Sequence, residues 1–205
     1  MPYAARYPGD VPRDALLRRF DTVLDGRIRH VRCALEAVHQ RHNAGAILRS
    51  CDAFGIHTVH WVGLKGDPAW RASRGTSQWV EQRAHDDAEA ALTSLDTEGY
   101  DVWIADLDAN GVPPEEVPLD RPICLWMGAE WVGVSDVARS AAKGVVTLPM
   151  FGFTQSLNVS VAAALCLRPL AERARRLGDV AKLRPDERTL AKHLWQRALD
   201  DGETD

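Results

Sequence analysis

Apolar residues recur along this chain with two different spacings, which together predict helices alternating with strands. Between residues 14 and 25 they stand three or four positions apart while Arg18 and Arg19 lie outside, which is typical of an amphipathic helix. Shorter β-branched and apolar runs predict buried strands at 31–38, 56–62, 101–105, 123–127 and 145–148. Further helices are expected at 43–55, 88–95, 135–144 and from 157 onward.

The first strand, the helix after it and the next strand follow one another closely. Asn43 is a good N-cap for that helix, and Gly55 is a good C-terminal stop. Strand, helix and strand in this order form a βαβ unit, which joins parallel strands. The chain is therefore expected to be an α/β protein with a parallel sheet flanked by helices.

The stretch 147–164 combines a strand end, a loop and a buried helix. Pro149 ends the strand, Gly152 marks a tight turn, and Ser156 stands where the N-cap of the helix is expected. The N-terminus of a helix offers unpaired N–H groups and a partial positive charge, which suit an anionic or phosphate-bearing ligand. A plain helix cap explains Ser156 equally well.

Two prolines mark the C-terminal part of the chain. Pro169 is expected to kink or split the long helix that begins at 157. Pro185 opens a final amphipathic helix, in which Leu190, Leu194 and Ala198 share one face.

Charge is distributed unevenly along the chain, whose formal net charge is −4. Residues 1–49 contain nine Lys or Arg and five Asp or Glu, whereas the remainder contains sixteen and twenty-four. Two more cations, Arg71 and Arg74, lie in the polar, turn-rich segment 65–77, which is expected to be a mobile loop. A basic segment on an acidic body is a footprint of polyanion binding, although an Arg-rich helix face exposed to water has the same composition.

Several classes of protein are disfavoured by what the sequence lacks. No apolar run reaches the ~20 residues of a membrane span, and the first nine residues have no signal-peptide core, so a cytoplasmic location is expected. The four cysteines, which are scattered without metal-ligand spacing, predict reduced thiols and no metal site. Neither a dinucleotide-binding glycine motif, nor a P-loop, nor the serine elbow of hydrolases occurs.

Three predicted strands end in loops that are rich in glycine and polar residues. Because ligands bind beyond the carboxyl ends of parallel strands, these loops are expected to meet at one site. Its candidate residues are Asn43, Arg49, Glu130, Ser156 and Asn158.

Three motifs in fixed order resemble those of the SpoU/TrmH-type RNA ribose methyltransferases of the SPOUT superfamily. The similarity extends over about residues 27–164 and is closest to the tRNA guanosine 2′-O-methyltransferase branch. The motifs are Asn43-Ala44-Gly45-Ala46-Ile47-Leu48-Arg49, Met127-Gly128-Ala129-Glu130-Trp131-Val132-Gly133-Val134-Ser135, and Leu148-Pro149-Met150 continued by Ser156-Leu157-Asn158-Val159-Ser160-Val161-Ala162.

The resemblance implies a fold, a cofactor and an assembly. The C-terminal part of the sheet would be tied in a trefoil knot, the protein would be a homodimer, and S-adenosylmethionine would bind in the knot. Residues 31–168 would form the methyltransferase domain, preceded by an RNA-binding extension (1–30) and followed by a helical one (169–205). The implied cofactor pocket comprises Ala105, Met127, Gly128, Leu148, Met150 and Leu157.

The resemblance also implies a reaction and the residues that serve it. Arg49 would be the essential catalytic residue, clamping a phosphate and orienting the ribose hydroxyl; whether it is itself the base stays open, because guanidinium normally stays protonated. Asn43 would support it, and Glu130, Ser156 and Asn158 would line the active site. The expected RNA contacts come from Arg18, Arg19, Arg41, Arg71 and Arg74.

The activity implied by these motifs is 2′-O-methylation of a ribose in RNA, with a guanosine in tRNA as the expected substrate. Ribosomal RNA is the alternative substrate. A relative that binds RNA without catalysis is the alternative from a different class of protein, and the complete set of motif residues argues against it.

Overall fold

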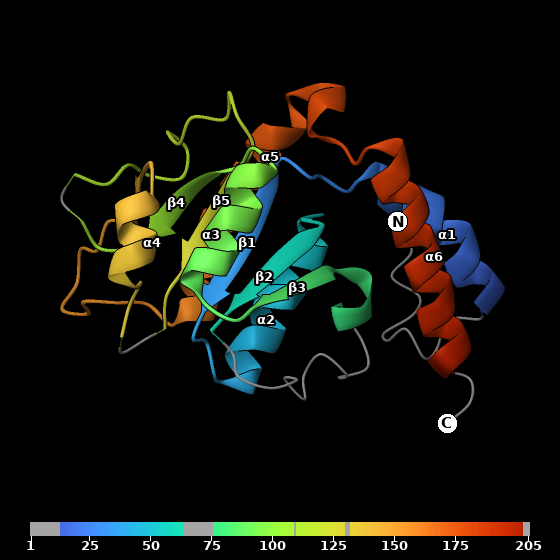
Figure 1. The fold of residues 1–205 in the computed structure, drawn as a ribbon, viewed down its shortest axis with the longest axis horizontal. Helices are drawn as coiled ribbons and strands as arrows, with labels where there is room; N and C mark the ends of the chain where they lie inside the picture. Colours follow the sequence, from blue (N-terminus) through green and yellow to red (C-terminus); the bar gives the residue numbers. More distant parts are fainter. Residues whose placement is uncertain (1–12, 64–75, 109, 130–131, 203–205) are drawn as a thin grey trace.

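The structure is a computed structural model that describes residues 13–63, 76–108, 110–129 and 132–202. Six parallel strands form a sheet in the order β3-β2-β1-β5-β4-β6 (Figure 1). The strands are β1 (Val31–Glu36), β2 (Thr58–Val62), β3 (Glu81–His85), β4 (Asp101–Ala105), β5 (Ile123–Met127) and β6 (Gly144–Val146). The helices are α1 (Arg13–Asp25), α2 (Arg41–Ala53), α3 (Ala88–Thr97), α4 (Asp136–Ala141), α5 (Val159–Arg175) and α6 (Pro185–Gly202), with 3-10 turns η2 (Thr76–Trp79) and η3 (Gly178–Ala181).

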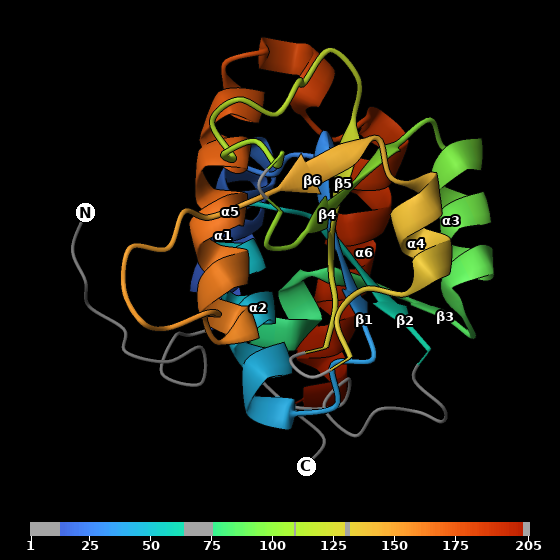
Figure 2. The ribbon, with the colours of Figure 1, turned by 90° about the vertical axis from the view of Figure 1, so that its left-hand side faces the viewer.

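Helices cover both faces of the sheet. α2 and α5 lie on one face, and α3 and α4 lie on the other (Figure 2). Successive residues of a strand point to opposite faces, so that Leu125 packs beneath α2 and α5 while Trp126 packs towards α3 and α4. A sheet covered in this way needs strands that are apolar on both sides, and β5 is buried throughout. The parallel α/β architecture predicted from the sequence is confirmed.

The two terminal helices form a separate small core. α1 and α6 lie side by side beyond the β2–β3 side of the sheet (Figure 1). Phe20 of α1 and Trp195 of α6 pack edge to face with ring centroids 5.3 Å apart, and Trp79 of η2 completes the cluster. Aromatic pairs favour this edge-to-face geometry because the positive ring edge meets the negative ring face.

The predicted strands all occur, and β4 and β5 have the predicted boundaries. The prediction missed β3, whose residues are mostly polar. This strand lies at the edge of the sheet, where one side of its backbone has no strand partner, so its sequence lacks the apolar run of a central strand. Gly55 stops α2 as expected: its φ is +71°, and any side chain would overlap the backbone oxygen of Gly26.

Two of the predicted helix caps are wrong. α2 begins at Arg41 after Gln40, so Asn43 lies inside its first turn and is buried rather than capping it. α5 begins at Val159, and its cap is Asn158 instead of Ser156; the Asn158 side chain accepts a hydrogen bond from the Ser160 amide at 2.9 Å. Ser135, by contrast, caps α4 as predicted and accepts from the Ala138 amide.

Pro169 does not split α5, and the packed face of α6 differs from the expected one. α5 continues from Val159 to Arg175 through Pro169, held by the fully buried Leu167, Leu170 and Ala171 around it. The division drawn at residues 168/169 therefore falls within one helix. In α6 the packed side chains are Ala191 and Trp195, while Leu190 and Leu194 of the predicted face are 56% and 46% exposed.

Candidate active site

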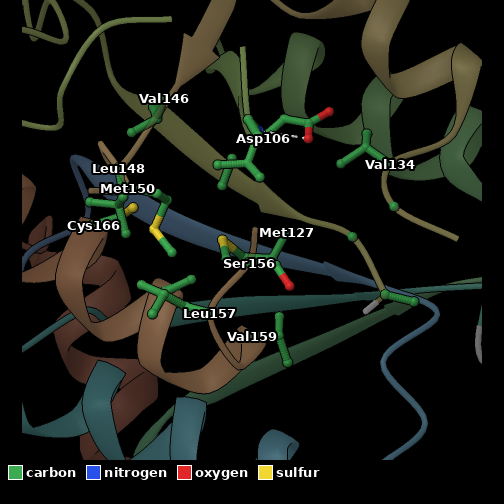
Figure 3. Close-up of a pocket in the computed structure, with 16 residues that line it drawn as sticks. Asp106, Met127, Val134, Val146, Leu148, Met150, Ser156, Leu157, Val159 and Cys166 are labelled. Atoms are coloured by element: carbon green, nitrogen blue, oxygen red, sulfur yellow. Dashed lines mark hydrogen bonds between the residues drawn. The ribbon is translucent and has the colours of Figure 1, made fainter. Parts of the chain in front are cut away.

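A cavity of about 200 Å³ opens at the carboxyl ends of β4, β5 and β6 beside the start of α5 (Figure 3). All six residues predicted for the cofactor pocket line it: Ala105, Met127, Gly128, Leu148, Met150 and Leu157. The remaining lining residues are Asp106, Leu107, Ala129, Gly133, Val134, Val146, Ser156, Val159, Ala162 and Cys166. Residues from three loops and one helix, far apart in the sequence, thus share one site beyond the carboxyl ends of the strands, where open parallel sheets bind ligands.

Most of the wall of this cavity is apolar. Leu148, Met150 and Leu157 gather on one side, and Met127 lies between them and the opposite wall (Figure 3). Burial raises the pKa of the Cys166 thiol to about 12, so this cysteine presents a neutral, unreactive sulfur. The flat apolar face of an aromatic ring is the kind of group that such a wall accepts.

Gly128 allows the two ends of the loop after β5 to approach closely beside the cavity. The amide of Gly133 donates to the carbonyl of Ala129 at 2.8 Å, which folds the loop back on itself. A Cβ at position 128 would overlap the backbone carbonyl of Gly133, and no flexible side chain is there to move aside. Residue 128 must therefore be glycine for this loop to keep its shape.

Glu36, at the end of β1, holds the far end of the same loop. Its carboxylate accepts from the indole N–H of Trp126 at 2.8 Å and from the backbone amide of Ser135 at 3.1 Å. The sequence analysis did not select this residue. An acid at the end of an otherwise buried strand was the available signal, because a partly buried carboxylate requires hydrogen-bond donors.

A hydrogen bond joins the first motif to the third. The Asn158 side chain donates from Nδ2 to Oδ1 of Asn43 at 3.0 Å, across 115 residues of sequence. Asn43 in turn donates to the side chain of Gln40 at 2.7 Å. The bond connects the first turn of α2 to the cap of α5, next to Val159 in the cavity wall.

The other predicted catalytic residues are placed differently. Ser156 lines the cavity, whereas Arg49 does not; it lies on the exposed face of α2, where its guanidinium has no ion-pair partner in the described part of the chain. Arg49 follows Asn43 by six positions, which places the two side chains about 120° apart around the helix. Glu130 lies outside the described residues.

The predicted RNA-binding arginines are exposed where the structure describes them. Arg18 and Arg19 lie on the outer face of α1, and Arg41 begins α2. Arg71 and Arg74 lie outside the described residues. Two other cations near α1 already have acidic partners: Arg188 of α6 lies 3.4 Å from Asp21 and 2.7 Å from Asp25, and Lys192 lies 2.9 Å from Asp21.

The described ranges contain no cluster of three metal-binding side chains, and no helix in them is long and apolar enough to cross a membrane.

An open parallel sheet with a loop-built cavity at its carboxyl edge defines an α/β ligand-binding protein. The family is given by comparison: the model of the SpoU rRNA Methylase family matches residues 30–168. The tRNA (guanosine(18)-2′-O)-methyltransferase of Thermus thermophilus is 36% identical over 192 residues, which cover 92% of this chain and 95% of that protein. This chain belongs to the SpoU RNA methylase family.

Solved structures agree with this assignment. The A. aeolicus TrmH/SpoU tRNA modifying enzyme matches with a TM-score of 0.79 and 27% identity, over 92% of this chain and 97% of that one. An AdoMet-bound rRNA methyltransferase from Sinorhizobium meliloti matches with a TM-score of 0.64 and 25% identity, over 74% of this chain and 59% of that one.

Proposed function

We propose that this protein transfers a methyl group from S-adenosylmethionine to the 2′-hydroxyl of a guanosine ribose in tRNA. One observation carries the proposal: the six residues that the family resemblance assigns to the cofactor come from three separate segments, and all six line a single cavity. The extent of the match to the Thermus tRNA methyltransferase supports tRNA over ribosomal RNA as the substrate. Both the reaction and the substrate imply a cytoplasmic location.

The residues of the cavity suit this cofactor. The apolar and sulfur-containing side chains of Leu148, Met150 and Leu157 fit an adenine ring, and Gly128 allows close approach of the loop backbone. When bound, S-adenosylmethionine supplies the methyl group that is transferred. Ser156, at the cavity wall, is positioned to face the reacting end of the substrate.

Arg49 is proposed to hold the RNA rather than the cofactor. An exposed guanidinium without an ion-pair partner in the described part of the chain is available for a phosphate, and its planar fork can contact two phosphate oxygens at once. The Asn43–Asn158 hydrogen bond would fix the helix that carries Arg49 against the helix that borders the cavity. Glu130 is assigned to the active site by its motif alone.

Exposed apolar residues support the proposed homodimer. Val161 and Leu165 of α5 are about half exposed. Phe151 and Phe153, in the segment that loops away from the sheet beside α5, are 96% and 107% exposed (Figure 2). Large apolar side chains that are exposed on α5 and in the segment before it favour a protein interface there, and a two-fold axis would pair this surface with itself. We expect light scattering at micromolar concentration to give the mass of a dimer.

The trefoil knot is proposed on the family resemblance. The segment after β4 packs along the outer edge of β6, where the Val112 amide donates to the Val145 carbonyl and the Thr147 amide donates to the Val112 carbonyl, both at 2.9 Å. The chain that leads into the third motif therefore runs beside an earlier loop, which is compatible with a knotted arrangement.

The function is tested by single-turnover methylation of a tRNA transcript. The wild-type protein is expected to methylate a guanosine ribose, and mass spectrometry of the digested RNA would identify the nucleoside. Arg49→Ala is expected to lower the rate at least about a hundredfold, because alignment and electrostatic stabilisation are lost in the transition state. Arg49→Lys should also fail, since an ammonium cannot make the two-pronged contact.

Cofactor affinity, measured by calorimetry on the same variants, should change little. Near-normal methylation by Arg49→Ala would show that another group organises the reaction. Absence of S-adenosylmethionine binding by the wild-type protein would refute the enzymatic function and favour a relative that binds RNA without catalysis.

A further inference from the structure

The cavity wall contains one charged side chain among the described residues, that of Asp106. It is the first residue after β4, and its backbone amide donates to the carbonyl of Val146 at 3.1 Å. In Figure 3 its carboxylate is directed towards the Val134 side of the cavity, away from Leu148 and Met150. One end of the site is therefore polar, and the other is apolar.

Two donors hold this carboxylate in place. The backbone amide of Leu107 donates to Oδ1 at 2.7 Å, and Nη2 of Arg139 donates to Oδ2 at 2.5 Å. Arg139 belongs to α4, so the pair connects the loop after β4 to the helix that follows the second motif. The hydrogen bond that Arg139 donates to Asp106 raises the pKa of Arg139, as expected for a guanidinium beside a carboxylate.

The charge of Asp106 is thus largely compensated, and this decides what it can bind. Arg139 supplies one positive charge to the carboxylate, so a second cation placed there gains little electrostatic energy. An ionised carboxylate nevertheless has about four acceptor positions, of which two are occupied. Neutral hydroxyl donors can use the remaining positions without competing with Arg139.

We infer that Asp106, positioned by Arg139, accepts hydrogen bonds from the ribose hydroxyls of the cofactor's adenosine and thereby determines cofactor affinity. The inference rests on the proposed function, since it takes the cavity to be the S-adenosylmethionine site. Carboxylates bind ribose hydroxyls in the same way in dinucleotide-binding proteins. The apolar end of the cavity then receives the base, and the Asp106 end receives the sugar.

The alternative is that Asp106 faces the sulfonium or the ammonium group of the cofactor. 5′-Methylthioadenosine separates the two, because it keeps the adenosine but has neither positive charge. The experiment is calorimetry on the full-length protein with S-adenosylmethionine, S-adenosylhomocysteine, 5′-methylthioadenosine and 2′-deoxy-5′-methylthioadenosine. The variants are Asp106→Asn, Arg139→Gln and the control Asp108→Asn, which makes the same charge change two residues away and outside the cavity wall.

For Asp106→Asn, the affinities for all three ribose-containing ligands are expected to fall about tenfold, as loss of a hydrogen bond to a charged group predicts. The wild-type protein should bind the 2′-deoxy compound about tenfold more weakly than its parent. In Asp106→Asn that difference should shrink markedly. Asp108→Asn should behave as the wild type.

Arg139→Gln tests the positioning role. Without the guanidinium, the carboxylate is no longer compensated, so binding should shift in favour of the cationic S-adenosylmethionine over 5′-methylthioadenosine. A purely structural role of Arg139 would lower both affinities equally.

Two results would overturn the inference. Weaker binding of S-adenosylmethionine by Asp106→Asn with unchanged binding of 5′-methylthioadenosine would place the carboxylate at the cationic end. Unchanged binding of every ligand would remove Asp106 from the site. Either outcome leaves the proposed function intact. That function fails if the wild-type protein binds no S-adenosylmethionine or does not methylate the tRNA transcript. Circular dichroism spectra matching the wild type would show that each variant is folded.

Discussion

The β4–β6 side of the sheet and its β2–β3 side are built from different kinds of side chain. Around the cavity the walls are aliphatic or sulfur-containing, and Asp106 is the charged residue of the described lining. On the β2–β3 side, His57, His60, Arg27 and Arg32 are buried, and the aromatic cluster of α1 and α6 lies next to them.

The two sides hold their shape by different means. At the cavity, backbone segments approach so closely that Gly128 cannot carry a side chain. On the other side, long charged side chains bridge elements: Arg32 donates to Glu98 at 2.8 Å, and Arg83 donates to the same carboxylate at 2.7 Å. These donors and their charges outweigh the opposing effect of burial and lower the pKa of Glu98 to about 2. The stability of the β2–β3 side should therefore depend on pH and on side-chain contacts. The stability of the cavity region should instead depend on how closely its backbone segments can pack.

The largest effect is expected from Trp195→Ala. This ring is 3% exposed and contacts Phe20, Trp79 and the guanidinium of Arg27, so its removal should lower the free energy of unfolding by about 3–5 kcal/mol. Cofactor affinity below the unfolding transition should change less than about twofold. Chemical denaturation and calorimetry measure the two quantities. Loss of cofactor binding in the folded variant would contradict the separation of the two regions.

Leu194→Ala is the matched control for this variant. It shortens the neighbouring side chain of α6, which is 46% exposed, and should cost no more than about 0.5 kcal/mol. A cost equal to that of Trp195→Ala would mean that both faces of α6 are packed in solution.

Gly128→Ala is expected to affect the other region. The added methyl group would displace the backbone of Gly133, at a cost of about 1–3 kcal/mol in stability, and should abolish measurable cofactor binding because the loop borders the cavity. Gly45→Ala is its control, since the new Cβ at this exposed helix position meets no atom within 4 Å and should add about 0.5–1 kcal/mol of stability. Calorimetry with S-adenosylmethionine, together with thermal unfolding, tests both. Normal cofactor binding by Gly128→Ala would show that the loop relaxes freely.

The sequence predicted the cavity region better than the terminal helices. Buried parallel strands are continuous apolar runs, so β4 and β5 could be located to the residue. In α6, however, Leu190 and Leu194 form one apolar stripe, and Ala191 and Trp195 form another. Helical periodicity alone does not indicate which of the two stripes is buried. The structure buries the stripe whose large aromatic ring can fill the space between Phe20 and Trp79.

The misassigned caps have a different cause. Asparagine and serine are both good N-caps, and local sequence offers no way to choose between Ser156 and Asn158. The contact that distinguishes them is the hydrogen bond from Asn158 to Asn43, whose partners are 115 residues apart in the sequence. Local sequence therefore does not reveal it. The same applies to Glu36, whose partners Trp126 and Ser135 lie 90 and 99 residues away.

The effect that is smallest at neutral pH concerns acid stability on the β2–β3 side. His60 has no exposed surface, and its Nδ1 lies 2.9 Å from Nε2 of His85. Burial, with the positive charge of Arg32 nearby, lowers the pKa of His60 to about 3. Because the folded-state pKa lies below the unfolded value of about 6.5, the stabilisation is complete above pH ~6.5 and is lost as the pH falls towards 3.

His60→Asn keeps a polar atom near the position of Nδ1 but cannot take up this proton. The plot of unfolding free energy against pH should therefore become shallower by up to about 1.4 kcal/mol per pH unit between pH ~6.5 and ~3, since one proton fewer is bound on unfolding. Urea denaturation at a series of pH values measures the slope, and His42→Asn, which replaces an exposed histidine of α2, is the control. An unchanged slope for His60→Asn would show that His60 takes up its proton as readily in the folded protein as in the unfolded chain, and would remove this histidine from the groups that make stability on this side sensitive to acid.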